Sequence, residues 1–307
     1  MDAPERKSRC SPATALEIEA GRLRVLLAAG SGLAGLFVAV AAHVGHGATL
    51  EQTIPRSMMK VMSRYEHLGM RAINFLAMRE WIYRNPRLKS WVEWLGEKIM
   101  GVANGEVLTL AEAREMVSSV IEAGYTVATG TCPCRRARNQ LDDDVPCNTD
   151  MVFGDWAESY LRNYPGLYRR LDEAEALELL KLFDDRGFIH QVYGYSRREG
   201  AAYVMCNCDP SVCIPLLAQK TRGFQAFRKG RSTARVSPEK CRGVEECGVC
   251  IARCPFDARS AGPGGLAAVD EEACFGCGVC VVSCAGGATS LERRDGAELV
   301  YAHRFVT

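Results

Sequence analysis

The sequence predicts an α+β fold in two parts: a mainly helical, cysteine-rich N-terminal domain with a small sheet or hairpin, followed by a compact C-terminal domain. Two observations lead to this prediction. The first is a pair of amphipathic helix patterns in the middle of the chain, with short strand-like segments after them. The second is a cysteine run that begins at residue 241 and recurs at residue 274. A chain of 307 residues is long enough for two such domains.

Cysteines are the most informative part of the composition. The chain has 15 of them, and all except Cys10 gather at residues 132–147, 206–213 and 241–284. Clustering at short spacings is typical of metal ligation in a reducing compartment, whereas disulfide-rich secreted scaffolds are much shorter. The formal net charge is only +1, which argues against a nucleic-acid-binding protein, because that class carries a strong basic excess. We therefore expect a cytoplasmic location.

The N-terminal third begins with a polar lead, residues 1–24, and continues with residues 25–44, which contain no charged side chain. Twenty uncharged positions meet the length of a membrane span, but three glycines and a serine make their hydrophobicity marginal. The segment is predicted as an apolar helix that is buried or lies on a membrane surface, with a membrane anchor as the alternative. The rest of the region 25–100 is predicted to form helical hairpins, broken at Pro55 and around Pro86.

Residues 101–215 are predicted to form a cysteine-rich α+β domain. A helix begins after Thr109, where a glutamate three positions later completes a capping box, and it stops before Gly124. Residues 172–187 repeat this design. The two apolar segments within 188–206 are then predicted to pair as a β-hairpin.

Two C-x-C pairs, each followed by a further cysteine, define a candidate metal site in this domain. A predicted strand precedes each pair. In an extended C-x-C both side chains point to the same face, because strand side chains alternate. If the two strands are neighbours, four to six thiols meet at one end of the sheet. The candidate ligands are Cys132, Cys134, Cys147, Cys206, Cys208 and Cys213.

The C-terminal cysteines form two matched runs. Residues 274–284 have the spacing C-x2-C-x2-C-x3-C, and residues 241–255 have the spacing C-x5-C-x2-C-x3-C-P. Together these runs resemble a bacterial-type dicluster ferredoxin domain, over residues 237–307. The resemblance implies a pseudo-symmetric βαβ fold that holds two [4Fe-4S] clusters and transfers single electrons.

In that family the fourth cysteine of each run ligates the other cluster. Two departures from the family pattern are visible: five residues fill the first gap, and Ala285 stands where a proline often follows the last cysteine. Neither departure removes a ligand. The resemblance implies one cluster on Cys241, Cys247, Cys250 and Cys284, and a second on Cys254, Cys274, Cys277 and Cys280.

The middle segment resembles a group of ferredoxin-domain proteins that carry CPCR and a CNC-type run, and this group implies no defined activity. Four interpretations of its cysteines stay open: a third [4Fe-4S] cluster, a structural zinc ion, a redox-active thiol pair, or ordinary buried cysteines. The cluster is favoured because the same chain carries cluster-binding runs. Arg135, Arg136 and Arg138 follow the first pair and are expected to offset the charge of a thiolate-ligated centre.

Residues 216–236 are predicted as a basic linker between the domains. They are expected either to form a solvated face or to dock an acidic redox partner, since such patches steer electron-transfer encounters. The cations concerned are Lys220, Arg222, Arg228, Lys229, Arg231 and Arg235.

The expected function is electron transfer, in which two [4Fe-4S] clusters relay electrons to or from a third cysteine-ligated centre. The first alternative is a reductase, an iron–sulfur oxidoreductase component whose substrate binds at the C-x-C cysteines. The second is a zinc-stabilised docking subunit of a larger complex.

Overall fold

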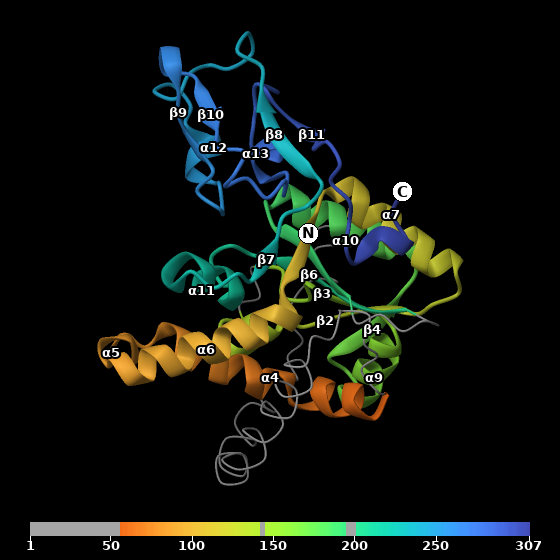
Figure 1. The fold of residues 1–307 in the computed structure, drawn as a ribbon. Coiled ribbons are helices and arrows are strands. Elements are labelled where there is room, and N and C mark those ends of the chain that lie inside the picture. Colours follow the sequence, from red (N-terminus) through yellow and green to blue (C-terminus); the bar gives the residue numbers. More distant parts are fainter. Residues whose placement is uncertain (1–55, 142–144, 195–200) are drawn as a thin grey trace.

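The computed structural model describes residues 56–141, 145–194 and 201–307, and its centre is a seven-stranded mixed sheet (Figure 1). Neighbouring strands are antiparallel throughout, except that β1 and β7 are parallel. The strand order is β4-β2-β3-β6-β5-β1-β7. The strands are β1 (Gly105–Leu108), β2 (Val127–Gly130), β3 (Asp150–Gly154), β4 (Tyr168–Leu171), β5 (Ile189–Gly194), β6 (Ala202–Cys208) and β7 (Phe227–Arg228).

The sheet is buried on both faces. Met151 and Phe153 of β3 belong to one apolar cluster, and Val152 between them belongs to another, as the two-residue period of a strand requires. Helices α7 (Leu110–Glu122) and α10 (Glu173–Asp185) cover the first face and pack against each other. On the second face α9 (Asp155–Asn163) packs on the strands.

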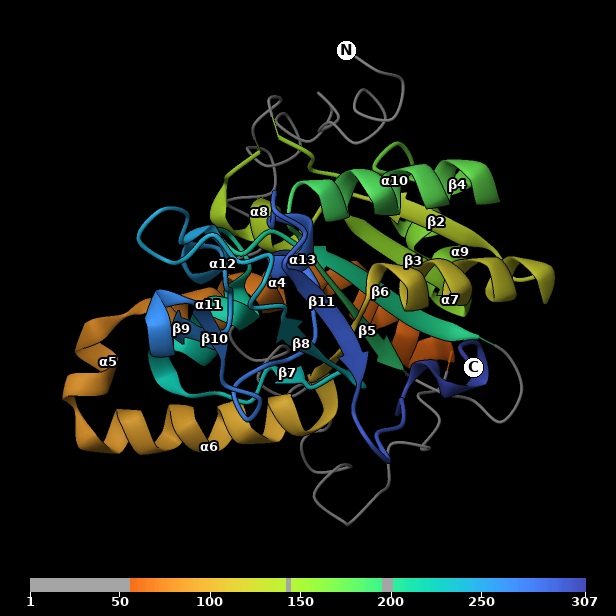
Figure 2. The ribbon, with the colours of Figure 1, turned by 90° about the horizontal axis from the view of Figure 1, so that it is seen from above.

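Helix α4 (Arg56–Met78) lies on the second face and contacts three shorter helices, α8 (Pro133–Arg138), α9 and α11 (Ile214–Arg222). The two helices after it, α5 (Glu80–Arg84) and α6 (Pro86–Ala103), form a hairpin that projects from the body (Figure 2). Asn85 caps α6, and proline at the first helical position fits there because its missing N–H needs no partner.

Both capped helices of the middle region are confirmed. Thr109 and Glu112 form the reciprocal capping box of α7, and Asp172 caps α10 through the backbone N–H of Glu175 at 2.8 Å. The β5–β6 hairpin is also confirmed. A mixed α and β fold is therefore observed as predicted.

The size of the sheet was not predicted correctly. The sequence predicts a mainly helical domain with a small sheet or hairpin, whereas the structure has seven strands. β1, β2 and β3 are only four or five residues long and buried at every position. β2 was predicted as the strand before Cys132. Such strands lack the alternation of apolar and polar residues that marks a half-exposed strand, so the pattern did not reveal β1 and β3.

The C-terminal lobe contains two strand–helix–strand units in succession. The first is β8 (Ser232–Val236), α12 (Val249–Ala252) and β9 (Arg259–Ala261); the second is β10 (Ala267–Val269), α13 (Val279–Val282) and β11 (Thr289–Arg293). β8 pairs with β11 and β9 pairs with β10, so each two-stranded sheet takes one strand from each unit. The chain then returns to the main sheet, where Glu106 of β1 accepts hydrogen bonds from the backbone N–H groups of residues 300–302.

The stretch predicted as a basic linker, residues 216–236, contains most of α11 together with β7 and β8. The predicted polar lead and the uncharged segment 25–44 lie outside the described residues. Among the helices of the described part, none combines the length and the apolar character needed to cross a bilayer.

Candidate metal centres

The two C-x-C pairs meet at one end of the sheet. β2 and β6 are not neighbours, because β3 lies between them. Both are antiparallel to β3, so they run in the same direction and deliver Cys132 and Cys206 to the same edge. The thiols therefore converge as predicted. The prediction was argued for two neighbouring strands, whereas in the structure β3 separates β2 from β6.

Five cysteines with free thiols form this thiol site, and their side chains make a continuous hydrogen-bonded series. The central three are at most 7% exposed. Backbone N–H groups of Arg135, Ile214 and Leu216 also donate to sulfurs of the series. In order, the thiols are Cys132, Cys134, Cys213, Cys208 and Cys206.

The two pairs reach the site by different local structures. Cys206 and Cys208 lie on β6 and share a face, as an extended C-x-C requires. Cys132 and Cys134 are not extended: Cys132 is the N-cap of α8, and Cys134 lies in its first turn. Pro133 explains the difference, because its fixed φ suits the first position of a helix.

Cys147 differs from the other predicted ligands of this site. It is fully buried, and its carbonyl accepts a hydrogen bond from the backbone N–H of Cys132 at 2.7 Å. It is disulfide-bonded, so its sulfur does not add to the free thiols.

The electrostatics of the thiol site favour a single thiolate. The thiols of Cys134 and Cys208 both donate to Cys213, and these hydrogen bonds lower the pKa of Cys213 to about 6. Hydrogen bonds to Cys206 and Cys213, together with burial, raise the pKa of Cys208 well above its usual value. A negative charge is therefore centred on Cys213, at the N-terminus of α11, where the helix dipole also favours it.

A buried polar group that the sequence did not reveal adjoins the thiols. Asp150 is 1% exposed; it accepts a hydrogen bond from Tyr168 at 2.5 Å and one from the Cys206 thiol at 3.7 Å. Burial raises the pKa of Asp150 to about 6. Burial and the nearby Asp150 carboxylate raise the pKa of Glu66 on α4 to about 8, while a hydrogen bond from Tyr160 opposes the shift. No sequence signal connects α4 with strands eighty residues later.

The arginines after Cys134 are only partly available to offset thiolate charge. Arg135 is buried and forms an ion pair with Asp209. Arg136 lies over the ring of Tyr164, with 5.1 Å between its guanidinium carbon and the ring centroid. Arg138 donates to the carbonyls of residues 211 and 212. The contacts of Arg135 and Arg138 instead join α8 to the loop that carries Cys213, and the contact of Arg136 joins α8 to the end of α9.

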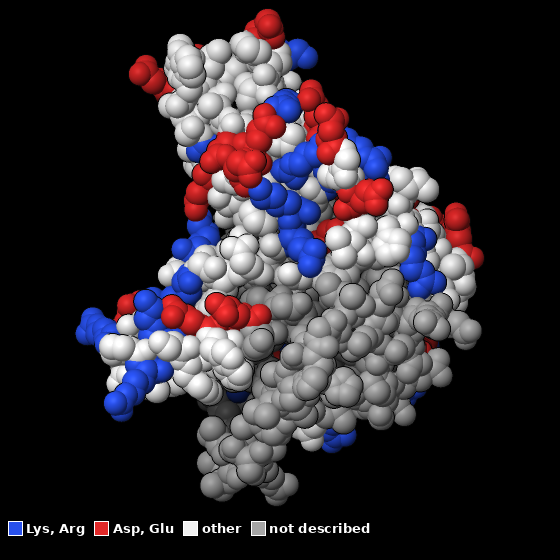
Figure 3. Space-filling model, viewed as in Figure 1, with Lys and Arg blue, Asp and Glu red and all other residues white. Residues whose placement is uncertain are grey.

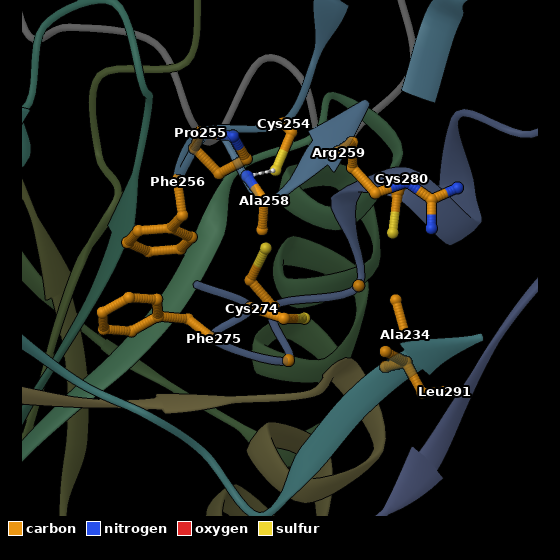
Figure 4. A pocket seen from close by; sticks show the side chains of 13 residues that line it. Ala234, Cys254, Pro255, Phe256, Ala258, Arg259, Cys274, Phe275, Cys280 and Leu291 are labelled. Carbon is orange, nitrogen blue, oxygen red and sulfur yellow. Dashed lines mark hydrogen bonds between the residues drawn. The ribbon is translucent and has the colours of Figure 1, made fainter. Parts of the chain in front are cut away.

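In the C-terminal lobe, four cysteines line one cavity (Figure 4). They are the set that the ferredoxin resemblance implies for one cluster, and we call them the inner set: Cys254, Cys274, Cys277 and Cys280. All four thiols are free. The backbone N–H of Ala258 donates to the sulfur of Cys254 at 3.3 Å.

Glycine is required in the loop that carries the inner set. Gly276 has a φ of +75°, and a Cβ there would stand 2.1 Å from the carbonyl oxygen of Ser232. Only glycine allows the loop to pass so close to β8 in this left-handed conformation. The same cavity is lined by the rings of Phe256 and Phe275, which stack with centroids 4.1 Å apart.

The remaining four cysteines of the lobe form the outer set: Cys241, Cys247, Cys250 and Cys284. Cys247 is exposed and the other three are half-buried. Burial would raise the pKa of Cys284, but hydrogen bonds from the backbone of Ala288 and the hydroxyl of Thr289 lower it. Cys250 packs on the same small apolar cluster as three members of the inner set, so the two sets lie side by side.

One apolar cluster joins the C-terminal lobe to the thiol site. Cys208 and Cys213 belong to it, and so does Cys277 of the inner set. Phe227 of β7 belongs to the same cluster, and its ring centroid is 5.4 Å from that of Phe256. The inner set and the thiol site therefore both contribute side chains to one buried apolar cluster.

The cations expected to dock a partner are largely paired within the chain. Acidic and basic side chains alternate over the lobe (Figure 3). Arg228 lies over the ring of Tyr301 and donates to Asn104. Docking of an acidic partner here stays a prediction. Five cations form ion pairs: Lys220–Asp257, Arg222–Glu80, Lys229–Glu272, Arg231–Glu112 and Arg235 with Glu271 and Glu292.

Within the described residues, no three or more His, Cys, Asp or Glu side chains already surround a single point as one metal ion requires. No protein-family model matches this chain, and a search of the curated proteins likewise finds no match. The arguments for function therefore depend on the geometry of the cysteine sites.

Proposed function

We propose that this protein is an iron–sulfur electron-transfer protein, in which two [4Fe-4S] clusters in the C-terminal lobe exchange electrons with a third cysteine-ligated centre at the thiol site. The observation that carries the proposal is the apolar cluster that contains Cys208, Cys213 and Cys277. Single electrons cross short stretches of packed protein, so two redox centres on one buried cluster are suitably placed for a relay.

The residues of the inner set fit a [4Fe-4S] cluster. Four free thiols line a cavity, as a cubane with one thiolate on each iron requires. These ligands surround a volume, not the single point that one ion needs. A buried cation, Arg259, lines the same cavity, and its Nε and Nη1 groups have no hydrogen-bond partner among the described residues. A thiolate-ligated cluster would supply the negative charge that this cation lacks.

The thiol site fits a third centre in a different way. Its five thiols already touch one another, so binding a cluster requires them to lose protons and move apart. Cys213 is the thiol whose environment best supports a thiolate, and it is the natural first ligand. Zinc remains the competing occupant, because four of these sulfurs are also a sufficient tetrahedral donor set.

When bound, the clusters accept and release single electrons. The chain supports that exchange by burying the inner set and by donating backbone N–H groups to its sulfurs, such as the N–H of Ala258 to Cys254. The stacked pair Phe256–Phe275 and the neighbouring Phe227 exclude water from the region between the lobe and the sheet. The half-buried outer set, with the exposed Cys247, is the side from which a partner would exchange electrons.

The test is the amount of iron, acid-labile sulfide and zinc per chain in anaerobically purified protein. We expect about twelve irons and no zinc, since each cubane holds about four irons. Cys213→Ser and Cys277→Ser should each lower iron to about eight. Ser211→Ala, in the loop between Cys208 and Cys213, is the matched control and should leave iron unchanged.

Other outcomes change the assignment. About eight irons with one zinc would make the thiol site structural and favour the docking-subunit alternative. Unchanged metal content in Cys213→Ser would show that Cys213 is not a ligand of the third centre. Iron absent from the wild-type chain would refute the proposal as a whole.

A reductase is the second candidate, and one observation favours it. The thiol site has five free thiols where a cubane needs four, and the protonatable Asp150 touches Cys206. The extra thiol would be available to a substrate. Limited alkylation of the iron-loaded chain tests this: one thiol of the five should react before the rest, and equal protection of all five would exclude the reductase.

A further inference from the structure

Arg259, the first residue of β9, is a buried cation without a carboxylate partner among the described residues. Its side chain is 6% exposed, and its Nη2 group donates to the hydroxyl of Thr289 at 3.3 Å. Its Nε and Nη1 groups have no hydrogen-bond partner within the described part of the chain. Burying an unpaired charge costs several kcal/mol, so a stable structure needs an anion at this position.

The position of Arg259 indicates which anion that is. The side chain lines the cavity of the inner set and lies beside Cys280 (Figure 4). The guanidinium and the Cys280 sulfur line the same buried cavity, so the positive charge acts directly on this sulfur. The guanidinium also donates to the hydroxyl of Thr289, and that hydroxyl bonds Cys284 of the outer set.

The two cysteine sets therefore experience the charge of Arg259 unequally. The inner set is in a low-dielectric environment, where one charge acts strongly over a few ångströms. In the outer set Cys247 is exposed, so water screens the same charge. A nearby cation favours the reduced form of a cluster, because reduction adds one negative charge.

We propose that Arg259 raises the reduction potential of the inner cluster, so that an electron shared by the two C-terminal clusters rests on the inner one, next to the thiol site. This inference depends on the proposed function. In the step itself the outer cluster is oxidised by one electron and the inner cluster is reduced by one, and no bond or proton changes place. Arg259 is a positioning residue that acts through the cluster.

The test is a redox titration of the iron-loaded full-length chain, followed by electron paramagnetic resonance. Arg259→Met removes the charge and keeps much of the side-chain volume, and it should move the electron distribution between the two clusters at least tenfold toward the outer one, about 59 mV for a one-electron couple. Arg259→Lys keeps the charge and should restore most of the wild-type distribution. Arg293→Met, at an exposed cation at the end of β11, is the matched control and should leave the electron distribution unchanged.

A second readout separates this role from a structural one. In chain stripped of iron, Arg259→Met removes an unpaired buried charge, so the lobe should be at least as stable as the wild-type lobe. In iron-loaded chain the same variant should be less stable than the wild type. A purely structural Arg259 would destabilise both forms equally.

The outcomes distinguish this inference from the proposal on which it depends. A wild-type chain without iron refutes the proposed function. An Arg259→Met chain that keeps its full iron content and an unchanged electron distribution overturns the inference alone.

Discussion

The five thiols at the end of the sheet touch one another, whereas the four cysteines of the inner set stand apart around a cavity. The thiol site is built on a sheet with a large apolar core of its own, 22 buried residues on one face. The corresponding core of the C-terminal lobe has four buried residues, and two of them are Cys274 and Cys280. Under the proposed function the stability of the lobe should therefore depend on its clusters more than the stability of the sheet does.

The largest expected effect follows from that difference. Under the proposed function, removing iron with a chelator under anaerobic conditions should lower the stability of the lobe, residues 232–293, more than that of the main sheet, because cluster binding adds its free energy to a lobe whose core is small. The main sheet should stay folded. Hydrogen exchange followed by mass spectrometry measures both: β8 and β11 should lose protection, while β3 and β6 keep it.

A lobe that stays protected without iron would show that its fold is independent of the clusters, and the contrast between the two regions would fail. The control is the Cys213→Ser chain. Iron loss confined to the thiol site should leave the hydrogen-exchange protection of the lobe unchanged, because no cysteine of the lobe is substituted in this chain.

The two regions also differ in how far the sequence predicted them. In the lobe each cysteine run lies within about a dozen residues, so its spacing describes a local loop. The four cysteines that the resemblance implies for the inner set do line one cavity. The thiol site is assembled from segments more than seventy residues apart. Its members were predicted, but the path by which they meet was not, since β3 lies between the two strands.

Two residues near the cysteine sites, one beside the thiol site and one in the cavity of the inner set, could not be predicted from the sequence. Glu66 is one polar residue on an amphipathic helix, and only the packing of α4 on α9 brings it to Tyr160. Arg259 follows the last cysteine of its run at a position that the spacing does not mark. Burial and the lack of a partner distinguish it from the other arginines of the lobe, and these are tertiary properties.

A smaller effect is expected from the acid group beside the thiols. The pKa of Glu66 is raised in the folded chain to about 8, so the folded state favours its protonated form. That contribution to stability is complete below the unfolded pKa of about 4.5 and is lost as the pH rises through about 8. Glu66→Gln should therefore gain stability relative to the wild type over this range, by about 1 to 3 kcal/mol at pH 8, allowing for partial exposure of the side chain.

Urea unfolding of the sheet at pH 5 and pH 8 measures the difference between the two chains. The matched control is Glu158→Gln on α9, where hydrogen bonds from Thr126 and Arg170 lower the pKa of the carboxyl and reverse the sign. Because Glu158 is ionised at both pH values, the stability difference between Glu158→Gln and the wild type should change little from pH 5 to pH 8. Identical urea unfolding curves for Glu66→Gln and the wild type would show that ionisation of Glu66 does not lower the stability of the folded chain.

The smallest effect is expected at Lys229, between β7 and β8, where the sheet passes into the lobe. Its ion pair with Glu272 is long, 3.6 Å, and the carboxylate is 99% exposed, so water and salt screen it. Two residues later Arg231 meets Glu112 at 2.6 Å with both side chains nearly buried. Lys229→Ala should therefore change the unfolding free energy of either region by less than about 0.5 kcal/mol. A larger loss, measured by urea unfolding in low and high salt, would mean that surface charge also holds the lobe to the sheet, and the two regions would be less independent than their cores indicate.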